Sequence, residues 1–515
     1  MVGFNQELTK YSTFSGTRYD ILNDELPSLS LGSGNKDVSQ NGYEWALRGG
    51  FFRLNYIYND RYLFEFNGRY DGTSRFPSDN RFVFLPSFSA AWRISEESFM
   101  QGTRDWLDNL KLRASYGILG NQMISSSDWS GNTKYYPYIP FMSNGTSTNW
   151  LFGDSYATTI NPGNLVSASL TWEKVATMNF GLDATFLNQR LDMSFDYYVR
   201  TTSDMLIKTS YPGVLGTTAP PENSAELKTR GWEMTLNWKD RIGKDFGYEL
   251  GFVLSDSQAE ITKYNNPTGD INTYYEGKKV GDIWGFEVEG LFQSDEEAQN
   301  WYDQSKIANV QWGAGDIKIK DLDGDGKIDY AKDTKTNGSG TLQDHGDQTI
   351  IGNTTPRYQY GITANLTYKD FYLNLFFQGV GKRDAWFSGN AFWPAATQYY
   401  NVQKWHVEES WSPENPDAYL PIPRATDSRN RGVKTDRYLQ DASYCRLKNL
   451  TVGWNLPKQW ISKVFLTNAT VYVSGENLFY ISKIKGPYDP EAIGGSGNMV
   501  YPFMKTYSLG INLTF

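Results

Sequence analysis

The segment 321–329 carries the sharpest chemical motif of this chain. It reads Asp-Leu-Asp-Gly-Asp-Gly-Lys-Ile-Asp, with aspartates at relative positions 1, 3, 5 and 9 and glycine at position 6. Alternating carboxylates and one sharp turn can wrap oxygen ligands around a hard cation, and this is the spacing of a calcium-binding loop. The predicted cofactor is therefore calcium, and the candidate ligands are Asp321, Asp323, Asp325, Lys327 and Asp329.

One position of this motif departs from the calcium-loop pattern. Position 12 is Lys332, where a bidentate glutamate is usual, so Asp333 or the later Asp347 would have to replace it. A turn rich in aspartate and glycine, without any ion, fits the same residues equally well. Both interpretations stay open on the sequence alone.

Residues for catalysis are scarce. The chain has two histidines, His345 and His406, which lie far apart in sequence. No zinc-spaced histidine pair, nucleophile elbow, Walker motif or dinucleotide glycine pattern occurs. A pair of carboxylates for glycoside hydrolysis has no diagnostic value among 58 acidic residues. We therefore predict that the protein is not an enzyme.

The elements that would carry these loops are amphipathic strands. Residues 506–515 alternate between an apolar and a polar side chain without interruption, and the same alternation recurs in 61–70, 191–200 and 357–368. Because a β-strand sends successive side chains to opposite faces, each segment forms one apolar and one polar wall. In a bilayer every backbone N–H and C=O must be paired, so many such strands predict an all-β, closed transmembrane barrel of antiparallel strands.

Alternation and turn residues together predict about fourteen strands. Tight turns alternate along the chain with long loops, as they do in transmembrane barrels with short periplasmic turns and long extracellular loops. The tight turns are 59–60, 188–189, 240–245 and 369–370, and the long loops are 11–42, 120–171, 203–227, 263–356, 383–442 and 481–503. Within one loop, Ser294 and Glu297 form a capping-box pattern that predicts a short helix to about Ser305, with a plain acidic loop as the alternative.

The composition agrees with a membrane barrel. Aromatic residues make up 16% of the chain, while all hydrophobic residues reach 39%. No segment approaches the roughly twenty apolar residues of a spanning helix. A barrel needs only half of each strand to be apolar, and it places Tyr and Trp at both membrane interfaces. The net charge of −9 argues against nucleic acid as a partner.

Two of the long loops hold aromatic side chains that could stack on sugar rings or other flat ligands. Loop packing and an interface girdle are the commoner roles of such residues. The candidates for ligand contact are Trp129, Tyr135, Tyr136 and Trp150 in 120–171, and Trp386, Trp393 and Tyr399 in 383–442.

Four sets of segments, spread over most of the chain, carry a recognisable signature. They are 61–76 with 85–94, 170–173 with 188–198, 316–329, and Arg446-Leu-Lys-Asn-Leu-Thr-Val-Gly-Trp-Asn-Leu-Pro457 with 471–479. Together they resemble the SusC/RagA family of TonB-linked outer-membrane transporters of Bacteroidetes. The resemblance implies a barrel of about 22 strands, plugged by an N-terminal domain. Residues 1–515 would be its C-terminal part, with 263–356 and 383–442 as large extracellular loops.

What the resemblance implies about function is active import across the outer membrane of a Gram-negative cell. The ligand would be an oligosaccharide or a peptide, and the partners would be a SusD-like surface lipoprotein, outer-membrane lipid and the TonB complex, reached through the plug region. The start of the chain has neither a basic nor an apolar leader segment. We expect the signal peptide, plug and TonB-contacting segment to lie outside this chain.

Two other functions stay open. A porin-like or adhesin barrel would close without a partner chain and act passively. A soluble, calcium-dependent glycan-binding β protein would use the motif at 321–329 and would need no detergent.

Overall fold

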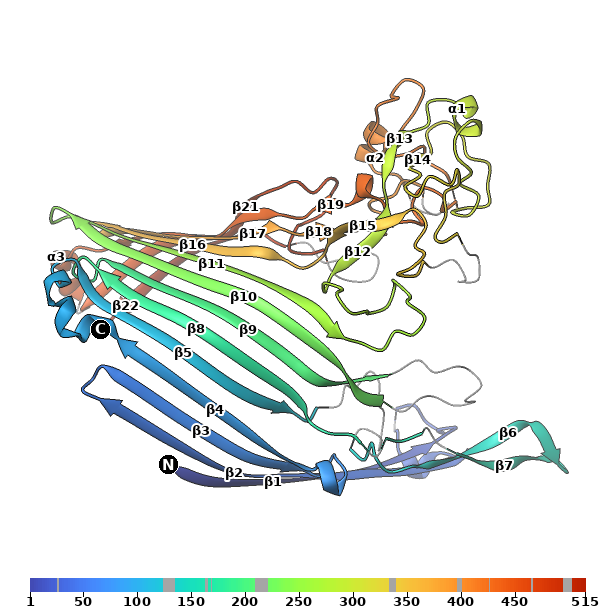
Figure 1. The fold of residues 1–515 in the computed structure, drawn as a ribbon, viewed down its shortest axis with the longest axis horizontal. Coiled ribbons are helices and arrows are strands. Elements are labelled where there is room, and N and C mark those ends of the chain that lie inside the picture. The colour runs from blue at the N-terminus through green and yellow to red at the C-terminus, as the bar shows by residue number, and fades with distance from the viewer. Residues whose placement is uncertain are drawn as a thin grey trace. The chain divides into compact units, whose positions relative to one another are not determined.

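The main element of the protein is an antiparallel sheet of fourteen strands. We describe a computed structural model that covers residues 1–515 apart from 26, 124–134, 163–164, 168, 209–220, 333–339, 396–400, 426, 465 and 494–502. The strand order is β1-β2-β3-β4-β5-β8-β9-β10-β11-β16-β17-β20-β21-β22 (Figure 1). Each strand of the sheet pairs with the next sheet strand along the chain, and the predicted number of about fourteen strands is confirmed.

These strands occupy the stretches that the predicted tight turns and long loops leave between them, to within a few residues, except at two hairpins. The strands are β1 (Val2–Arg18), β2 (Lys36–Tyr58), β3 (Tyr62–Thr73), β4 (Phe82–Arg93), β5 (Leu107–Asn121), β8 (Glu173–Phe186), β9 (Leu191–Lys208), β10 (Pro221–Ile242), β11 (Phe246–Lys263), β16 (Arg357–Tyr368), β17 (Phe371–Lys382), β20 (Tyr444–Asn455), β21 (Asn468–Ser482) and β22 (Thr506–Thr514).

The two exceptions are hairpins whose strands run far into predicted loops. β1 and β2 pair without a break from Val2↔Phe52 to Arg18↔Lys36, so most of the predicted loop 11–42 is strand. β9 and β10 likewise extend into the predicted loop 203–227. The prediction was wrong there because backbone pairing continues where the side chains do not alternate. Most side chains in the β1 and β2 extensions are polar, and Met205, Leu206 and Ile207 of β9 are consecutive apolar residues.

The tight turns have the backbone that hairpins require. Asn59 and Asp60, between β2 and β3, have φ of 50° and 53°. Two consecutive positive φ values match the right-handed twist of the flanking strands, as in a type I′ turn.

Residue contacts divide the chain into two compact units, and each is described by itself. Unit 1 comprises residues 1–91, 114–178 and 200–227, and unit 2 comprises residues 92–113, 179–199 and 228–515. In unit 1 the predicted loop 120–171 contains a hairpin of β6 (Met142–Phe152) and β7 (Ser155–Pro162). A small core of Phe76, Leu170 and Trp172 lies in the same unit.

In unit 2, the two largest predicted loops share one core, and we call this body the loop subdomain (residues 263–356 and 383–442). It lies at the ends of β11, β16 and β17 away from their tight turns (Figure 1). Its paired strands are β12 (Asp282–Phe286) with β15 (Gln348–Asn353), β13 (Val288–Leu291) with β14 (Ile317–Ile319), and β18 (Asp384–Ala385) with β19 (Gln440–Asp441). Its core includes Phe286, Phe292, Phe387, Trp393 and Tyr438, each at most 2% exposed.

The helices are short. They are α1 (Asp295–Gln299), α2 (Lys404–Glu409) and α3 (Lys458–Ile461), with 3₁₀ turns at Leu29–Leu31, Ser78–Asn80, Ile94–Glu96, Ser98–Thr103, Asp436–Tyr438 and Ser462–Val464. The predicted helix start is confirmed, because Ser294 Oγ accepts the Glu297 amide at 3.1 Å. The helix ends at Gln299 rather than near Ser305. None of the helices in the described part of the chain is long and apolar enough to cross a membrane.

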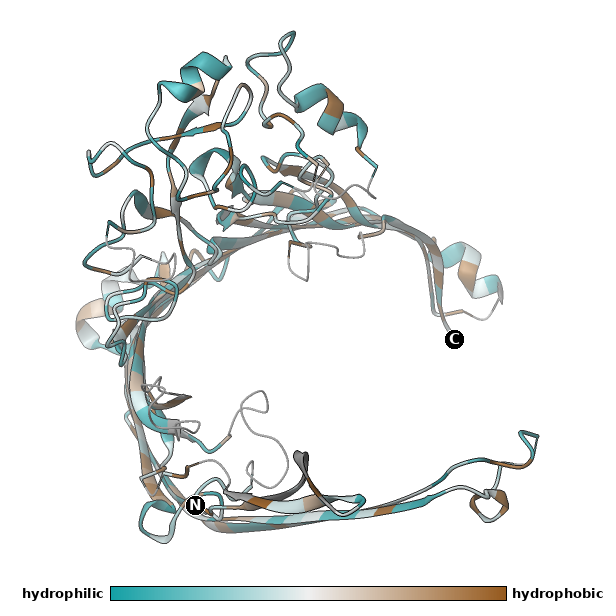
Figure 2. Ribbon diagram, turned by 90° about the vertical axis from the view of Figure 1, so that its right-hand side faces the viewer, coloured by the Kyte–Doolittle hydropathy of each residue, from teal (hydrophilic) through white to brown (hydrophobic). Residues whose placement is uncertain are grey.

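The sheet has one apolar face and one polar face, as the alternation of side chains predicts. Figure 2 shows apolar and polar residues alternating along the strands. In β22, Tyr507, Leu509 and Ile511 share the apolar wall and are 62–76% exposed. Exposed aromatic and aliphatic side chains in a continuous wall are typical of a surface that faces lipid.

Glycines opposite tyrosines shape the sheet locally. Tyr372 pairs with Gly453 and Tyr472 pairs with Gly510 across neighbouring strands. The tyrosine ring covers the glycine so closely that a Cβ at Gly453 would lie 2.1 Å from Tyr372 Cζ. Only glycine leaves room for this ring position, which is the aromatic covering of strand glycines known from sheet design.

Candidate functional site

The calcium-loop motif forms a compact turn between β14 and β15, and we call residues 321–329 together with Asp347 the acidic loop. Asp321, Asp323 and Asp347 each present one carboxylate oxygen, and these three oxygens lie within 4.8 Å of one another. The structure therefore brings together two of the predicted ligands and one of the two residues that could replace the missing glutamate. The other such residue, Asp333, lies outside the described residues.

Backbone amides hold this turn. Asp321 accepts the amides of Gly324 at 2.7 Å and Gly326 at 3.0 Å, and both glycines have positive φ. The Leu322 and Asp329 amides donate to the two oxygens of Asp347 at 2.7 and 2.9 Å. The sequence folds this way because glycine adopts the left-handed backbone at little cost, so the chain can reverse around the carboxylates.

The remaining predicted ligands, Asp325, Lys327 and Asp329, differ in their exposure to solvent. Asp325 and Lys327 are exposed, and Asp325 accepts the Lys327 amide at 2.9 Å. Asp329 is 7% exposed, and its Oδ1 has no hydrogen-bond partner among the described residues. Burial first, and then the charges of Asp325 and other nearby aspartates, raise the pKa of Asp329 above its ordinary value.

A second site lies in unit 1, on the polar wall, and we call it the Arg75 cluster (Tyr11, Tyr43, Trp45, Arg75 and Tyr135). The rings of Tyr11 and Tyr43 stack with centroids 4.7 Å apart, and Tyr135 stacks on Tyr43 at 3.8 Å. The Arg75 guanidinium carbon lies 4.8 Å from the Trp45 ring centroid and 5.5 Å from that of Tyr135. Aromatic faces attract a cation in this way.

Arg75 is unusual because it is buried and pairs with no carboxylate of the described residues. It is 4% exposed, and in the described part of the chain its Nε has no hydrogen-bond partner. Its Nη1 contacts Met123 Sδ at 3.5 Å. Burial lowers the pKa of this guanidinium from its ordinary value. A buried cation without an anion is costly, so an anionic or strongly polar ligand group would satisfy it.

The wall on which this cluster lies follows from the strand register. Tyr43, Trp45 and Arg53 are separated by even steps along β2, which pairs with β3 without a bulge. They therefore share one face of the sheet. Arg53 pairs with Glu65 on that face at 2.5 Å, so the face is the polar one. Sequence reasoning missed Tyr11, Tyr43 and Trp45, because aromatic residues on strands look the same whether they face a ligand or a neighbour. It missed Arg75 because the sequence does not show that this arginine, which follows β3, is buried.

The predicted ligand-contact residues fall into three groups. Tyr135 stacks in the Arg75 cluster, and the Tyr136 hydroxyl donates to the Glu44 carbonyl at 2.7 Å. Trp386 is partly buried, whereas Trp393 is 2% exposed and donates from Nε1 to the Phe387 carbonyl. In this structure Trp393 packs in the core rather than at a ligand surface. Outside the described residues lie Trp129, Tyr399 and the side chain of Trp150.

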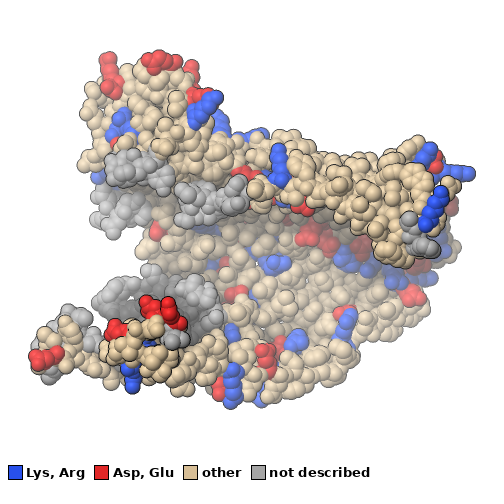
Figure 3. Space-filling view, turned by 180° about the vertical axis from the view of Figure 1, so that it is seen from behind, with Lys and Arg blue, Asp and Glu red and all other residues tan. Residues whose placement is uncertain are grey.

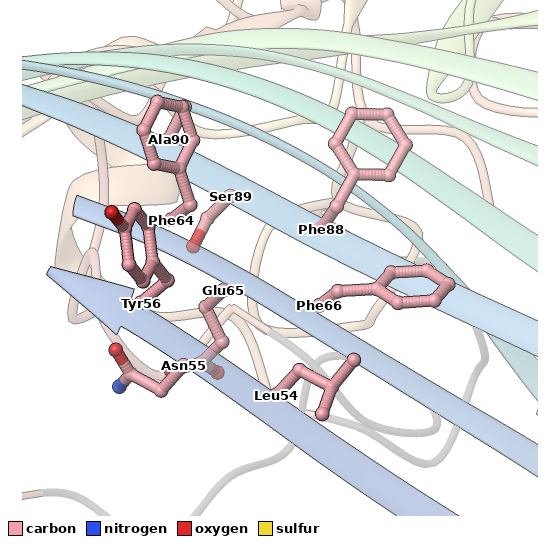
Figure 4. A pocket seen from close by; sticks show the side chains of 9 residues that line it. All are labelled: Leu54, Asn55, Tyr56, Phe64, Glu65, Phe66, Phe88, Ser89 and Ala90. Atoms are coloured by element: carbon pink, nitrogen blue, oxygen red, sulfur yellow. The ribbon is translucent and has the colours of Figure 1, made fainter. Parts of the chain in front are cut away.

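An apolar pocket of about 550 Å³ lies between β2, β3 and β4 (Figure 4). Leu54, Phe64, Phe66 and Phe88 line it and are between 38% and 61% exposed. Leu54 pairs with Phe66 in the register, on the wall opposite Arg53 and Glu65. The pocket is thus a depression in the apolar wall.

A polar pocket of about 530 Å³ lies in unit 2 and is lined in part by β15, the strand that follows Asp347. Lys279, Arg357 and Lys382 contribute cationic groups to its lining, and Asp282 and Asp384 contribute carboxylates. Arg357 is paired with Asp256.

Acidic side chains gather on the outer end of the loop subdomain, where α1 lies (Figures 1 and 3).

The comparisons with known proteins agree with this fold. A family model described as TonB dependent receptor-like, beta-barrel, matches residues 2–271. The chain is 29% identical to TonB-dependent receptor P3 of Formosa agariphila, over 99% of this chain and 50% of that protein. It is 30% identical to TonB-dependent receptor SusC of Bacteroides thetaiotaomicron, over 90% of this chain and 43% of that protein.

A solved structure of the RagAB peptide importer in the 'open-open' state matches with a TM-score of 0.73 and 24% identity, over 99% of this chain and 52% of that one. The chain thus spans about half the length of the proteins it matches. It belongs to the TonB-dependent receptor-like β-barrel family. The similarity to SusC and to RagAB agrees with the SusC/RagA resemblance that the four segments predicted. The chain is therefore an outer-membrane protein of Gram-negative bacteria, grouped with receptors and transporters rather than with enzymes.

Proposed function

We propose that this chain forms the barrel wall and outer loops of an active importer of oligosaccharides or peptides. In this proposal it works with a SusD-like surface lipoprotein and is driven through the TonB complex. The observation that supports import most directly is the similarity to SusC and to the RagAB peptide importer along almost the whole chain. Fold likeness alone would support only a barrel.

Within this proposal the Arg75 cluster contacts the ligand. It combines an aromatic stack with a buried guanidinium on the polar wall, the wall that lines the lumen in a barrel of this class. Aromatic faces suit sugar rings and peptide side chains, and a guanidinium suits a carboxylate or a row of hydroxyl oxygens. The predicted contacts of Tyr135 and Tyr136 belong to this part of the proposal.

The test is uptake by cells that carry the complete native protein. Labelled oligosaccharides and labelled peptides are supplied separately, with and without a protonophore, and a tag on the barrel is used to isolate bound proteins. We expect one ligand class to enter only with the proton gradient intact, and a surface lipoprotein to co-purify. If the uptake rate is the same with and without the protonophore, and no lipoprotein is bound, the proposal is contradicted and a passive barrel is favoured.

The local contact is tested with Arg75→Gln. We expect uptake to fall about tenfold or more, because a charge-assisted hydrogen bond to the ligand is lost. The matched control is Arg104→Gln, an arginine with a 61% exposed side chain that pairs with Glu96. Equal uptake by Arg75→Gln and native protein, at equal amounts of folded barrel, would remove Arg75 from the ligand site.

A further inference from the structure

We propose that the acidic loop binds one calcium ion, with Asp321, Asp323, Asp329 and Asp347 as its carboxylate ligands. Three of these residues already present oxygens within 4.8 Å of one another. Residues 321 to 329 supply the alternating ligands, and Asp347 comes from the segment that leads into β15. The site is therefore closed by a residue far along the chain and does not depend on the missing glutamate at position 12.

A separate observation points to a cation. The residue Asp329 is 7% exposed, and its Oδ1 is buried and receives no hydrogen bond from any described residue. This oxygen lies against Gly346, the neighbour of Asp347, since a Cβ built on Gly346 would meet it at 2.5 Å. A buried carboxylate oxygen without a donor is unfavourable unless a positive charge reaches it.

The donor set favours calcium over magnesium. All candidate ligands are carboxylate oxygens, and calcium accepts six to eight oxygens in irregular geometry. Magnesium requires near-ideal octahedral geometry and gives up its water reluctantly. Lys332, at position 12, places its ammonium 3.3 Å from Asp323 and compensates part of the negative charge. We therefore expect this lysine to weaken calcium binding without preventing it.

Bound calcium would join the turn after β14 to the start of β15. β15 pairs with β12, and Gly352 and Asn353 of β15 line the polar pocket. The ion would thus restrain one side of the loop subdomain. This role is independent of import and of the ligand that is imported.

The experiment is calorimetric titration of the full chain, purified in detergent and freed of metal with a chelator. Calcium chloride and magnesium chloride are titrated separately. We expect one saturable calcium site, weaker magnesium binding, and at least about tenfold weaker calcium binding in Asp321→Asn/Asp323→Asn. The control Glu287→Gln/Glu289→Gln removes two acidic groups of the same subdomain, and it should bind calcium as the native chain does.

A variant expected to bind calcium more tightly is also needed, because the double variant could lose calcium binding simply by misfolding. Lys332→Glu removes the competing ammonium and supplies the glutamate usual at position 12, so we expect tighter calcium binding. Calcium should also protect residues 321–347 from proteolysis in the native chain but not in Asp321→Asn/Asp323→Asn. The proposal is overturned if the native chain binds no calcium at millimolar concentration, or if the double variant binds it equally well.

Discussion

Asp316 and Arg424 form a bidentate ion pair across 108 residues of sequence. Arg424 donates from Nε to Asp316 Oδ1 at 2.6 Å and from Nη2 to Oδ2 at 2.8 Å. Arg429 and Asn430 donate to the same carboxylate at 3.1 and 2.9 Å. Asp316 is 0% exposed, so one buried carboxylate joins the two predicted loops 263–356 and 383–442.

Asp316→Ala should destabilise the loop subdomain by about 3–5 kcal/mol, because it removes the buried carboxylate that Arg424 and Arg429 share and leaves Arg429 with Asp427 alone of the acidic partners Asp316 and Asp427. Hydrogen exchange of the β13 and β14 amides measures this loss. The control Glu408→Gln breaks an exposed pair with Lys404 and should change stability by about 0.5 kcal/mol or less. Unchanged exchange in Asp316→Ala would show that the ion pair does not hold the two loops together.

His406 should make the loop subdomain sensitive to mild acid. It is 1% exposed, Nδ1 accepts the Gln403 amide at 3.1 Å, and Nε2 lies 3.1 Å from the Ala391 carbonyl oxygen. This arrangement fits the neutral ring with its proton on Nε2, and burial lowers the pKa of His406 below 6.5. A lowered pKa means that the unfolded state binds more protons, so stability is lost as pH falls below about 6.5.

Proteolysis of the subdomain between pH 7.5 and 5 measures this effect. We expect faster cleavage at the acidic end in the native chain. His406→Asn removes the titrating ring, so its cleavage rate should lack the step near this pH. A step of the same size in both proteins would assign the effect to other groups.

Gly453→Ala should destabilise the sheet by about 1–3 kcal/mol, because the added methyl group overlaps the ring of Tyr372. The matched control is Gly50→Ala in β2, where an added Cβ meets no atom within 4 Å. That change should be neutral or slightly stabilising. Urea unfolding of the barrel, followed by tryptophan fluorescence, compares the two. Equal midpoints would mean that Tyr372 moves aside at no cost.

Trp393→Ala should cost about 3–5 kcal/mol of subdomain stability, as expected for deletion of a large core side chain. Trp393→Phe keeps part of the packing and should cost less. Thermal unfolding of the subdomain ranks the two variants. A Trp393→Ala protein of native stability would return Trp393 to the candidates for ligand contact.

The strands were predictable because their signal is local. Residues 506–515 alternate with period two, and that period depends only on neighbouring residues and on which wall is apolar. The extensions of β1 and β2 were not predictable in this way, since polar residues on both faces carry no period. Ser294 predicted a helix start from a local cap, but the helix end depends on packing in the loop subdomain.

The sequence by itself determined the strands with one apolar and one polar face, their approximate number, and the aspartate spacing at 321–329, because each follows from residues close together in the chain. Only the tertiary structure decided which distant groups meet. It placed Asp347 beside Asp321, Arg75 between Trp45 and Tyr135, and Trp393 in a core shared by two loops. Such contacts depend on how loops pack against one another, and the periodicity of the sequence does not predict that packing.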